Sequence, residues 1–293
     1  MKKIVCFGEV LWDIFPTHKK IGGAPLNVAT RLKSLDNEVA IITRIGKDTE
    51  GDEIAAFIKN HKINAEGVQI DKHLKTGDVQ VSLNAKGSAS YTIMHPRAWD
   101  HIAIEEHAKL MIAKADAFVF GSLIARDAIS RDSLFEYLKC AKYKILDINL
   151  RPPHYTIETL LELMYAADFI KFNDEEIFEI AKALGQPTDN LESIIQWIAK
   201  KTNTKCICVT LGKKGAILFK DQQFCYNKGY KIKVVDTVGA GDSFLATLID
   251  QLLKDTEPQA ALNKASAVGA IVASSEGANP VISEEQIVAI LNN

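Results

Sequence analysis

The sequence predicts a three-layer α/β/α protein, in which helices cover both faces of a mostly parallel central sheet and a small β-sheet forms a lid. Three observations lead to this prediction. Short, uniformly apolar runs alternate with segments in which apolar residues recur at helical spacing. Most of these runs end in glycine or polar residues, as buried parallel strands do. Between residues 76 and 94 the pattern changes to strict alternation, which is typical of a half-buried sheet.

The chain begins with a strand-helix-strand unit. Residues 3–8 contain the apolar run Ile-Val-Cys-Phe and predict a first buried strand. A helix is predicted over residues 25–35, where apolar residues recur at helical spacing and Pro25 suits a first helical turn. Residues 39–43 predict the next strand.

The lid is predicted from the alternating segment. Residues 76–94 predict a hairpin, because alternate residues are apolar on both sides of a turn at 84–87. Residues 11–20 also lack the continuous apolar pattern of a fully buried strand, so we expect them to join the hairpin in a small separate sheet. We therefore interpret residues 11–20 and 76–100 as the lid of a single domain that spans residues 1–293.

The rest of the chain resumes the alternation of strand and helix. Further buried strands are predicted at residues 117–122, 144–149, 168–173 and 206–212. After residue 239 the pattern is mainly helical, with breaks at Pro258 and at 277–280. Ligands of such folds gather at the carboxyl ends of the strands, so the residues that follow each strand are the candidates for a site.

Composition excludes several classes of function. The net charge of -2, from 35 basic and 37 acidic residues, gives no field that would hold nucleic acid. The five cysteines form no CxxC pair, so neither a disulfide framework nor a structural zinc site is indicated. No apolar run approaches the roughly 18 residues of a membrane span, and the N-terminus does not fit a signal peptide. We therefore expect a cytoplasmic protein with no membrane partner.

The segment 234–244, VVDTVGAGDSF, has the strongest chemical pattern. A short apolar strand is predicted to lead into three small residues, Gly239, Ala240 and Gly241, and then into a helix from Asp242 to 253. Small residues at a helix start leave backbone N–H groups uncovered, which suits a phosphate that gains charge during transfer. Asp242 could serve in that chemistry or could simply cap the helix.

The sequence resembles the ribokinase, or pfkB-type, carbohydrate kinases. The stretch DTVGAGDSF at 236–244 is similar to the second signature of that family, and GGAPLNVA at 22–29 resembles the first. Intermediate matches occur at DINLR (147–151), NDEE (173–176) and VTLGKKGA (209–216), so the resemblance covers essentially the whole chain. Neither a GxxxxGK[ST] loop nor a GxGxxG fingerprint is present. The resemblance implies a ribokinase-like fold and ATP-dependent phosphorylation of a sugar hydroxyl.

The resemblance also implies the role of each matched residue. Asp242 matches the catalytic base, and an ordinary pKa of about 3.9 would leave it ionised at neutral pH. The backbone N–H groups of Gly239, Ala240, Gly241 and Asp242 would form the anion hole. The matched sugar-binding residues are Asp13, Gly22, Gly23 and Asn27. Asn149 and Arg151 match an element of fructokinase-like members in which the arginine lies near the transferred phosphoryl group, although Ile148 replaces the usual proline.

Two residues of the lid return have alternatives that the sequence leaves open. Arg97 could contact a sugar hydroxyl or a phosphate. Trp99 could stack on a sugar face or anchor the lid.

ATP and Mg²⁺ are the implied cofactors. Asn173 and Glu176 match an N-x-x-E pattern in which the glutamate helps to hold Mg²⁺ through water, although the same residues would also suit a helix N-terminus. The residues matched to the nucleotide side are Thr210, Gly212, Lys213, Gly215 and, in the adenine pocket, Asn263. Several members also bind a monovalent cation such as K⁺ through carbonyls near Asp236 and residues 274–279.

Fructose is the favoured substrate, because the overall pattern looks closest to bacterial fructokinases. Ribose, 2-keto-3-deoxygluconate and nucleosides remain alternatives, whereas a sugar phosphate is disfavoured because the lid has no compact basic cluster. A sugar sensor without catalysis is disfavoured by the intact Asp242 and glycine segment, and a dinucleotide-dependent oxidoreductase by the missing fingerprint. Unpaired lid edges would allow a homodimer.

Overall fold

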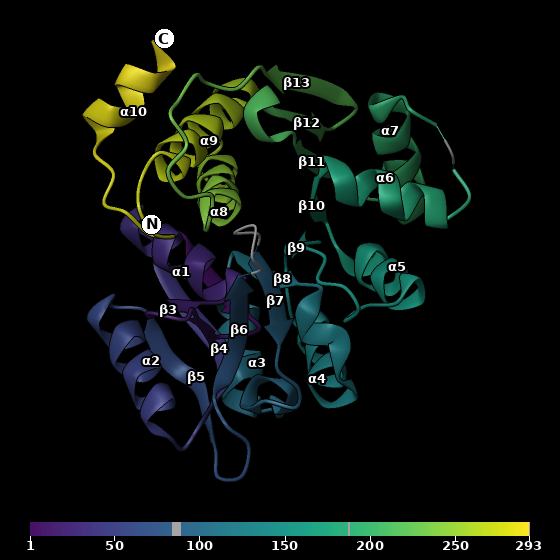
Figure 1. The fold of residues 1–293 in the computed structure, drawn as a ribbon. Helices are drawn as coiled ribbons and strands as arrows, with labels where there is room; N and C mark the ends of the chain where they lie inside the picture. Colours follow the sequence, from purple (N-terminus) through teal and green to yellow (C-terminus); the bar gives the residue numbers. More distant parts are fainter. Residues whose placement is uncertain (84–88, 187, 293) are drawn as a thin grey trace.

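The central layer is a nine-stranded sheet in the computed structural model, which describes residues 1–83, 89–186 and 188–292 (Figure 1). Its strand order is β13-β12-β11-β10-β9-β8-β1-β4-β5. All pairs from β11 to β5 are parallel, and β12 and β13 add an antiparallel hairpin at one edge. The strands are β1 (Lys3–Phe7), β4 (Glu38–Gly46), β5 (Asn64–Asp71), β8 (Ala117–Gly121), β9 (Lys144–Asp147), β10 (Phe169–Asn173), β11 (Cys206–Thr210), β12 (Ala216–Lys220) and β13 (Gln223–Asn227).

Helices cover both faces of this sheet, because successive strand residues point to opposite sides. In β1, Ile4 and Cys6 belong to one hydrophobic cluster with α1, α2, α8 and α9, whereas Val5 and Phe7 belong to a second cluster with α3 to α7. The three-layer prediction is confirmed. The helices are α1 (Ala24–Ser34), α2 (Thr49–Asn60), α3 (Glu106–Lys114), α4 (Ala128–Leu138), α5 (Ile157–Ala166), α6 (Asp174–Ala183), α7 (Leu191–Thr202), α8 (Ala240–Leu253), α9 (Pro258–Ala273) and α10 (Glu284–Leu291).

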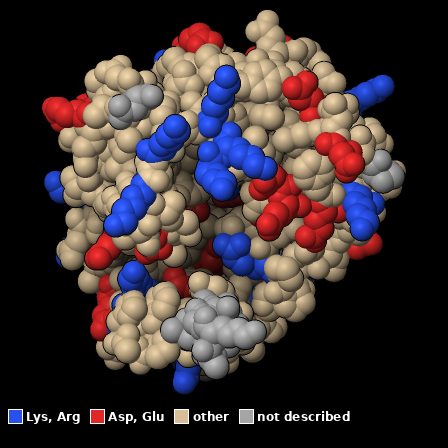
Figure 2. All heavy atoms as spheres, turned by 45° about the horizontal axis from the view of Figure 1, so that its top comes forward, with Lys and Arg blue, Asp and Glu red and all other residues tan. Residues whose placement is uncertain are grey.

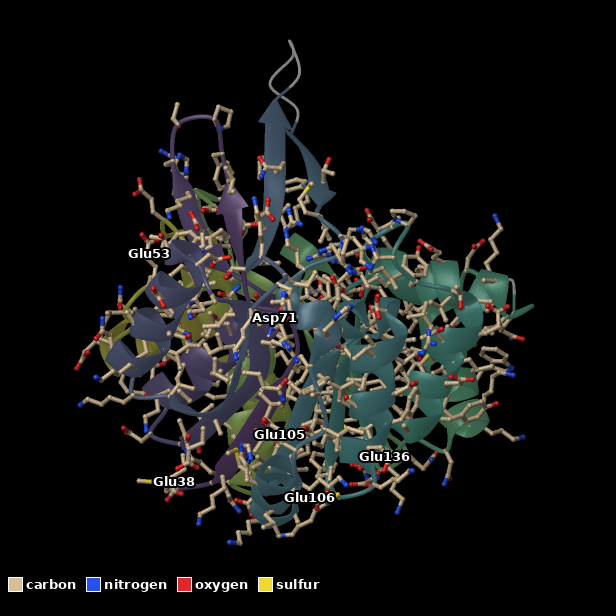
Figure 3. All side chains as sticks on the ribbon, turned by 90° about the horizontal axis from the view of Figure 1, so that it is seen from below. Glu38, Glu53, Asp71, Glu105, Glu106 and Glu136 are labelled. Carbon is tan, nitrogen blue, oxygen red and sulfur yellow. The ribbon has the colours of Figure 1, made fainter. Side chains whose placement is uncertain are left out.

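A second, four-stranded sheet has the order β3-β2-β6-β7 and contains both predicted lid segments. Its strands are β2 (Leu11–Ile14), β3 (Lys19–Gly22), β6 (Gly77–Leu83) and β7 (Ala89–Ile93). The predicted turn at 84–87 lies outside the described residues. Figure 3 shows this small sheet projecting from the body, with the labelled Asp71 near the place where it joins. Strands β3 and β7 are its edges, and a dimer through them stays a prediction.

The prediction of an apolar strand before Gly239 is wrong. No strand forms between β13 and α8, and Val234 and Val235 are 58% and 54% exposed. Their segment lies against the end of α9 instead, where the N–H of Val235 bonds the carbonyl of Ala273 at 2.9 Å. The three C-terminal helices are confirmed, although α8 begins at Ala240 and not at Asp242. None of the helices in the described part of the chain is both long and apolar enough to cross a membrane.

Candidate active site

The candidate residues lie at the carboxyl ends of the strands, beside the lid. Strand β2 of the lid follows β1 after only three residues, and β9 and β10 end at Asp147 and Asn173. The space-filling view in Figure 2 shows a hollow near the middle of one face, with acidic and basic side chains together at its floor and rim. This arrangement agrees with the expectation that ligands gather at this edge of the sheet.

The start of α8 presents free backbone N–H groups. Gly239 is the N-cap with φ 75°, and a Cβ there would lie 2.5 Å from the Cβ of Ala278, so only glycine fits. Within the described residues, the N–H groups of Gly241 and Asp242 have no acceptor, whereas that of Ala240 bonds the carbonyl of Thr237 at 3.3 Å. The first turn of the helix can therefore receive an anion.

Asp242 lies in the first turn of α8 but does not cap the helix. The cap is Gly239, and no side chain bonds the free N–H groups. One carboxylate oxygen of Asp242 instead accepts a 2.8 Å hydrogen bond from the side-chain amide of Asn27, whose own oxygen accepts one of 3.1 Å from Asn279. Three segments that are far apart in sequence thus fix the direction of this carboxylate.

The environment raises the pKa of Asp242 to about 6, above its ordinary range. Burial is the largest cause, and the nearby carboxylate of Asp147 adds to it. The hydrogen bond from Asn27 and the positive charges of Lys171 and Arg151 lower the pKa and partly offset this rise. The expectation of an ordinary pKa near 3.9 is therefore wrong, because the sequence does not reveal how deeply the carboxyl is buried.

Asp13 and the two glycines lie together where the lid meets α1. A Cβ on Gly22 would come within 2.6 Å of a carboxylate oxygen of Asp13, and one on Gly23 within 2.5 Å of the carbonyl oxygen of Glu9. Gly23 also has φ 107°. Both positions therefore require glycine, and the absence of side chains leaves Asp13 open to a ligand.

Arg151 faces these acidic groups. Burial raises the pKa values of Asp13, Glu9 and Asp242, and the positive charge of Arg151 opposes each of these rises. The side chain is exposed, and its one hydrogen bond in the described structure goes to the carbonyl of Leu150. Asn149, which precedes it by two residues, has φ 39° and lets the chain turn sharply after β9.

The two residues of the lid return are already engaged. Arg97 forms an ion pair with Asp78 of β6 and donates to the carbonyl of Pro96. Trp99 is fully buried, with the guanidinium of Arg126 3.9 Å from its ring centre. Trp99 therefore anchors the lid and does not stack on a sugar.

Asn173 and Glu176 form a capping box at the start of α6. The Asn173 side chain accepts from the N–H of Glu176, and the Glu176 carboxylate accepts from the N–H of Asn173, both at 2.8 Å. The other oxygen of Glu176 accepts from the N–H of Leu150 at 2.9 Å. Glu176 therefore joins α6 to the loop that carries Arg151.

A buried ion pair that sequence reasoning missed lies beneath the start of α8. Lys171 of β10 donates a 2.8 Å bond to Asp147 at the end of β9, and both side chains are less than one-tenth exposed. The ammonium lies 3.6 Å from the position of a Cβ on Gly241. The second oxygen of Asp147 is buried without a partner among the described residues. A lysine inside the apolar run of 168–173 was the signal that could have revealed this pair.

Glu9 is a second residue that the sequence analysis missed. It directly follows β1 and Gly8 and is 4% exposed, and its Oε2 atom has no hydrogen-bond partner in the described structure. Burial raises the pKa of Glu9 to about 7, a rise that the negative charge of Asp242 favours and the positive charge of Arg151 opposes. The signal available in the sequence was its position just after the first strand. Its burial without a partner marks it as a candidate, because buried unpaired carboxylates are rare outside functional sites.

The residues predicted for the nucleotide lie around the hairpin edge of the sheet. Gly215 has φ 96°, and a Cβ there would overlap the backbone of Asn227 and Gly229. Thr210 donates to the carbonyl of Phe172, and the Lys213 side chain and Gly212 are exposed. Asn263 is held by the side-chain amides of Asn227 and Gln259 at 2.9 and 3.0 Å.

The segment around Asp236 joins two loops beside α8. The Asp236 carboxylate accepts from the N–H of Val238 at 3.0 Å and from that of Gly277 at 3.3 Å. No group of three or more His, Cys, Asp or Glu side chains arranged to hold a metal occurs among the described residues. A cation here would therefore depend on backbone oxygens.

Comparison with known proteins decides the family. Residues 1–285 match the pfkB family carbohydrate kinase. The chain belongs to this family. It is therefore an ATP-dependent sugar kinase, as the two signatures predicted.

Relatives of this pfkB kinase include plant fructokinases. The probable chloroplastic fructokinase-6 of Arabidopsis thaliana is 30% identical over 97% of this chain and 81% of its own length. Fructokinase-2 of Zea mays is 28% identical over 95% of this chain and 90% of its own length.

Solved structures share the fold of this pfkB kinase. The fructokinase of Xylella fastidiosa with bound ATP has a TM-score of 0.87 at 22% identity, covering 99% of this chain and 98% of its own. The fructokinase of Vibrio cholerae with fructose, ADP and calcium ion bound has a TM-score of 0.84 at 23% identity, covering 99% of each chain.

Proposed function

We propose that this protein transfers the γ-phosphoryl group of ATP to a hydroxyl of D-fructose, with Asp242 as the general base. The observation that carries the proposal is the position of the Asp242 carboxylate, which Asn27 holds at 2.8 Å beside the free N–H groups of α8. Fructose as the substrate is supported by the fructokinases among the relatives, one of which holds fructose and ADP.

The chemistry follows from this position. As the sugar oxygen bonds to the γ-phosphorus, its proton passes to Asp242, and the bond from that phosphorus to the bridging oxygen breaks to release ADP. With a pKa of about 6, Asp242 is ionised at neutral pH yet is a stronger base than an ordinary aspartate. The N–H groups of Gly241 and Asp242, together with the ammonium of Lys171, would stabilise the charge on the transferred group.

The sugar would lie between the lid and α8. Asp13 and Asn27 offer a carboxylate and a carboxamide to sugar hydroxyls, and Gly22 and Gly23 allow the ring to approach the backbone. Arg151, whose charge acts on both Asp13 and Asp242, would lie between the sugar and the transferred phosphoryl group. Asn149 places the loop for this contact.

The residues present also fit a magnesium ion. Mg²⁺ is usually held by one or two carboxylates, several waters and substrate phosphates. The unpartnered oxygen of Asp147 and the buried carboxylate of Glu176 supply such groups at the ends of β9 and β10. Bound with ATP, the ion would neutralise phosphate charge. We assign the monovalent-cation position implied by the family to the carbonyls around Asp236 and residues 274–279.

The proposal is tested by ADP release with ATP and Mg²⁺ over a panel of fructose, ribose, 2-keto-3-deoxygluconate and adenosine. We expect the highest kcat/KM with fructose. A preference for another panel member would retain the kinase chemistry and overturn fructose. Sugar binding without ADP release on any panel member, in protein of native circular dichroism, would favour a sugar sensor in place of a kinase.

A further inference from the structure

A second cavity lies outside the proposed sugar and nucleotide sites. It has a volume of about 270 Å³ and is bordered by the loop after β8, the start of α5 and the lid return. The share of liquid volume taken by one water is about 30 Å³, so the cavity has room for a ligand much larger than a single ion. Nothing in the proposed reaction uses it.

Four basic side chains border this cavity, and among the described residues no Asp or Glu does. They are His95, Arg126, Arg131 and His154. Asp100 pairs with Arg126, and Asp127 lies 3.3 Å from His95. Arg131 has no ion pair among the described residues. Because Asp100 and Asp127 lie against Arg126 and His95, the uncompensated positive charge of the lining is that of Arg131, which favours an anion.

Arg126 is fixed in place with one donor unused. Its Nε and Nη2 atoms bond the two oxygens of Asp100 at 2.7 and 2.8 Å, and Nη2 also bonds the carbonyl of Met94. Its side chain is 3% exposed. The Nη1 atom is buried and has no hydrogen-bond partner among the described residues. A buried guanidinium nitrogen without an acceptor is costly, and a bound oxyanion would satisfy it.

The start of α5 adds backbone donors and hydroxyls. Thr156 is its N-cap and bonds the N–H of Thr159 at 3.2 Å, and both threonines border the cavity. In the same first turn, the N–H groups of Ile157 and Glu158 have no acceptor among the described residues, although these two residues do not border the cavity. The N-terminus of a helix attracts anions through such free N–H groups and its dipole.

We propose that this cavity binds a phosphate group, either free or borne by a small sugar phosphate. Two arginines and a helix N-terminus form the usual recognition set for a phosphate dianion. A sugar monophosphate is the better match, because the cavity exceeds the size of a bare ion. The site borders the lid at His95 and does not depend on fructose as the substrate.

The test is calorimetric titration of the kinase, saturated with ADP, with inorganic phosphate, glucose 6-phosphate and glucose. We expect phosphate or glucose 6-phosphate to bind with a Kd below about 1 mM, and glucose not to bind. Arg131→Gln should weaken this binding by about tenfold or more, because it removes a charged hydrogen-bond donor. Lys139→Gln, which removes one charge at the exposed end of α4, should bind as the wild type does.

The relative affinity of the two anions identifies the source of the phosphate group. Tighter binding of glucose 6-phosphate indicates a sugar phosphate, and equal or tighter binding of inorganic phosphate indicates the free ion. The proposal is overturned if neither binds, if Arg131→Gln binds as tightly as the wild type, or if ADP abolishes binding.

A second measurement does not depend on any variant of Arg131. Burial and the positive charges of Arg126 and His95 lower the pKa of His154. A bound dianion would offset those charges, so the pKa of His154 should rise on addition of the anion. NMR titration of the imidazole signals, with His154→Gln to identify the resonance, measures this change. An unchanged pKa at saturating anion contradicts the proposal.

Discussion

The side-chain amide of Asn27 in α1 lies 2.8 Å from the carboxylate of Asp242 in α8, which joins the predicted sugar pocket to the proposed base. This hydrogen bond lowers the pKa of Asp242, whereas burial raises it, with a net value of about 6. The carboxylate form is needed for proton removal. The pH at which the enzyme loses activity should therefore depend on the hydrogen bond from Asn27 to Asp242.

We predict that kcat/KM falls below about pH 6, by roughly tenfold per pH unit. In Asn27→Ala the acid limb should move to higher pH, because the hydrogen bond that favours the ionised form is lost. Asn64→Ala, on an exposed part of β5, is the control and should leave the limb in place. Glu9 has a pKa of about 7 and titrates in the same pH range. If Asp242 is the base, kcat/KM of Glu9→Gln should still decline below about pH 6.

Asp242→Asn should stabilise the fold at neutral pH while it removes the base. The pKa of Asp242 is about 6 in the folded protein and about 3.9 when unfolded, so ionisation destabilises the native state as pH rises through this interval. The variant should gain roughly 1–3 kcal/mol in free energy of unfolding at pH 8 and nothing below about pH 4. Urea unfolding at both pH values measures this, and equal differences at the two would contradict it.

The buried pair of Lys171 and Asp147 should couple strongly. Although burial disfavours the ammonium, the charges of Asp147 and Glu176 raise the pKa of Lys171 overall, so the ion pair is maintained. Lys171→Met should cost about 3–5 kcal/mol in free energy of unfolding, because it leaves a buried carboxylate uncompensated.

A double-mutant cycle checks this coupling. Lys171→Met with Asp147→Asn should cost less than the sum of the two single changes. Lys139→Met, at an exposed ion pair of α4, is the control and should change stability little. If the cost of the double variant equals the sum of the two single costs, the two side chains do not interact as described.

Gly22→Ala should weaken sugar binding selectively. The added Cβ would lie 2.6 Å from a carboxylate oxygen of Asp13, so Asp13 must move. We expect KM for the sugar to rise by about tenfold or more, as loss of a charged hydrogen bond does, with KM for ATP unchanged. At Gly121 the nearest atom to an added Cβ is 3.6 Å away, so Gly121→Ala is the matched control. A similar KM increase in both variants would argue against a role for Asp13 in sugar binding.

The layered fold was predictable because its strands are short apolar runs with clear ends. Residues 3–8, 117–122 and 206–212 each gave a strand, and the alternation after residue 76 gave the lid. The same criterion failed at Val234 and Val235, since a pair of apolar residues does not show whether a sheet edge is free. In the structure this segment bonds the end of α9, where the N–H of Val235 donates to the carbonyl of Ala273.

The site was predictable only as far as its motifs extend. The two signatures gave Asn27 and Asp242, and the structure shows that they bond directly. Lys171, Asp147 and Glu9 were missed, because their relevance depends on burial and on neighbours from separate strands. The raised pKa of Asp242 depends on the same three-dimensional environment.

The central claim, that Asp242 removes the proton of the sugar hydroxyl, is tested most directly by the kcat of Asp242→Asn with its best sugar. Calorimetry should show that the variant still binds the sugar, and Asp255→Asn, in the exposed turn after α8, serves as the control. We predict that kcat falls by about 10²-fold or more, the contribution typical of a positioned base. A variant that keeps kcat within about tenfold of the wild type would contradict the account, because its carboxamide cannot accept the proton.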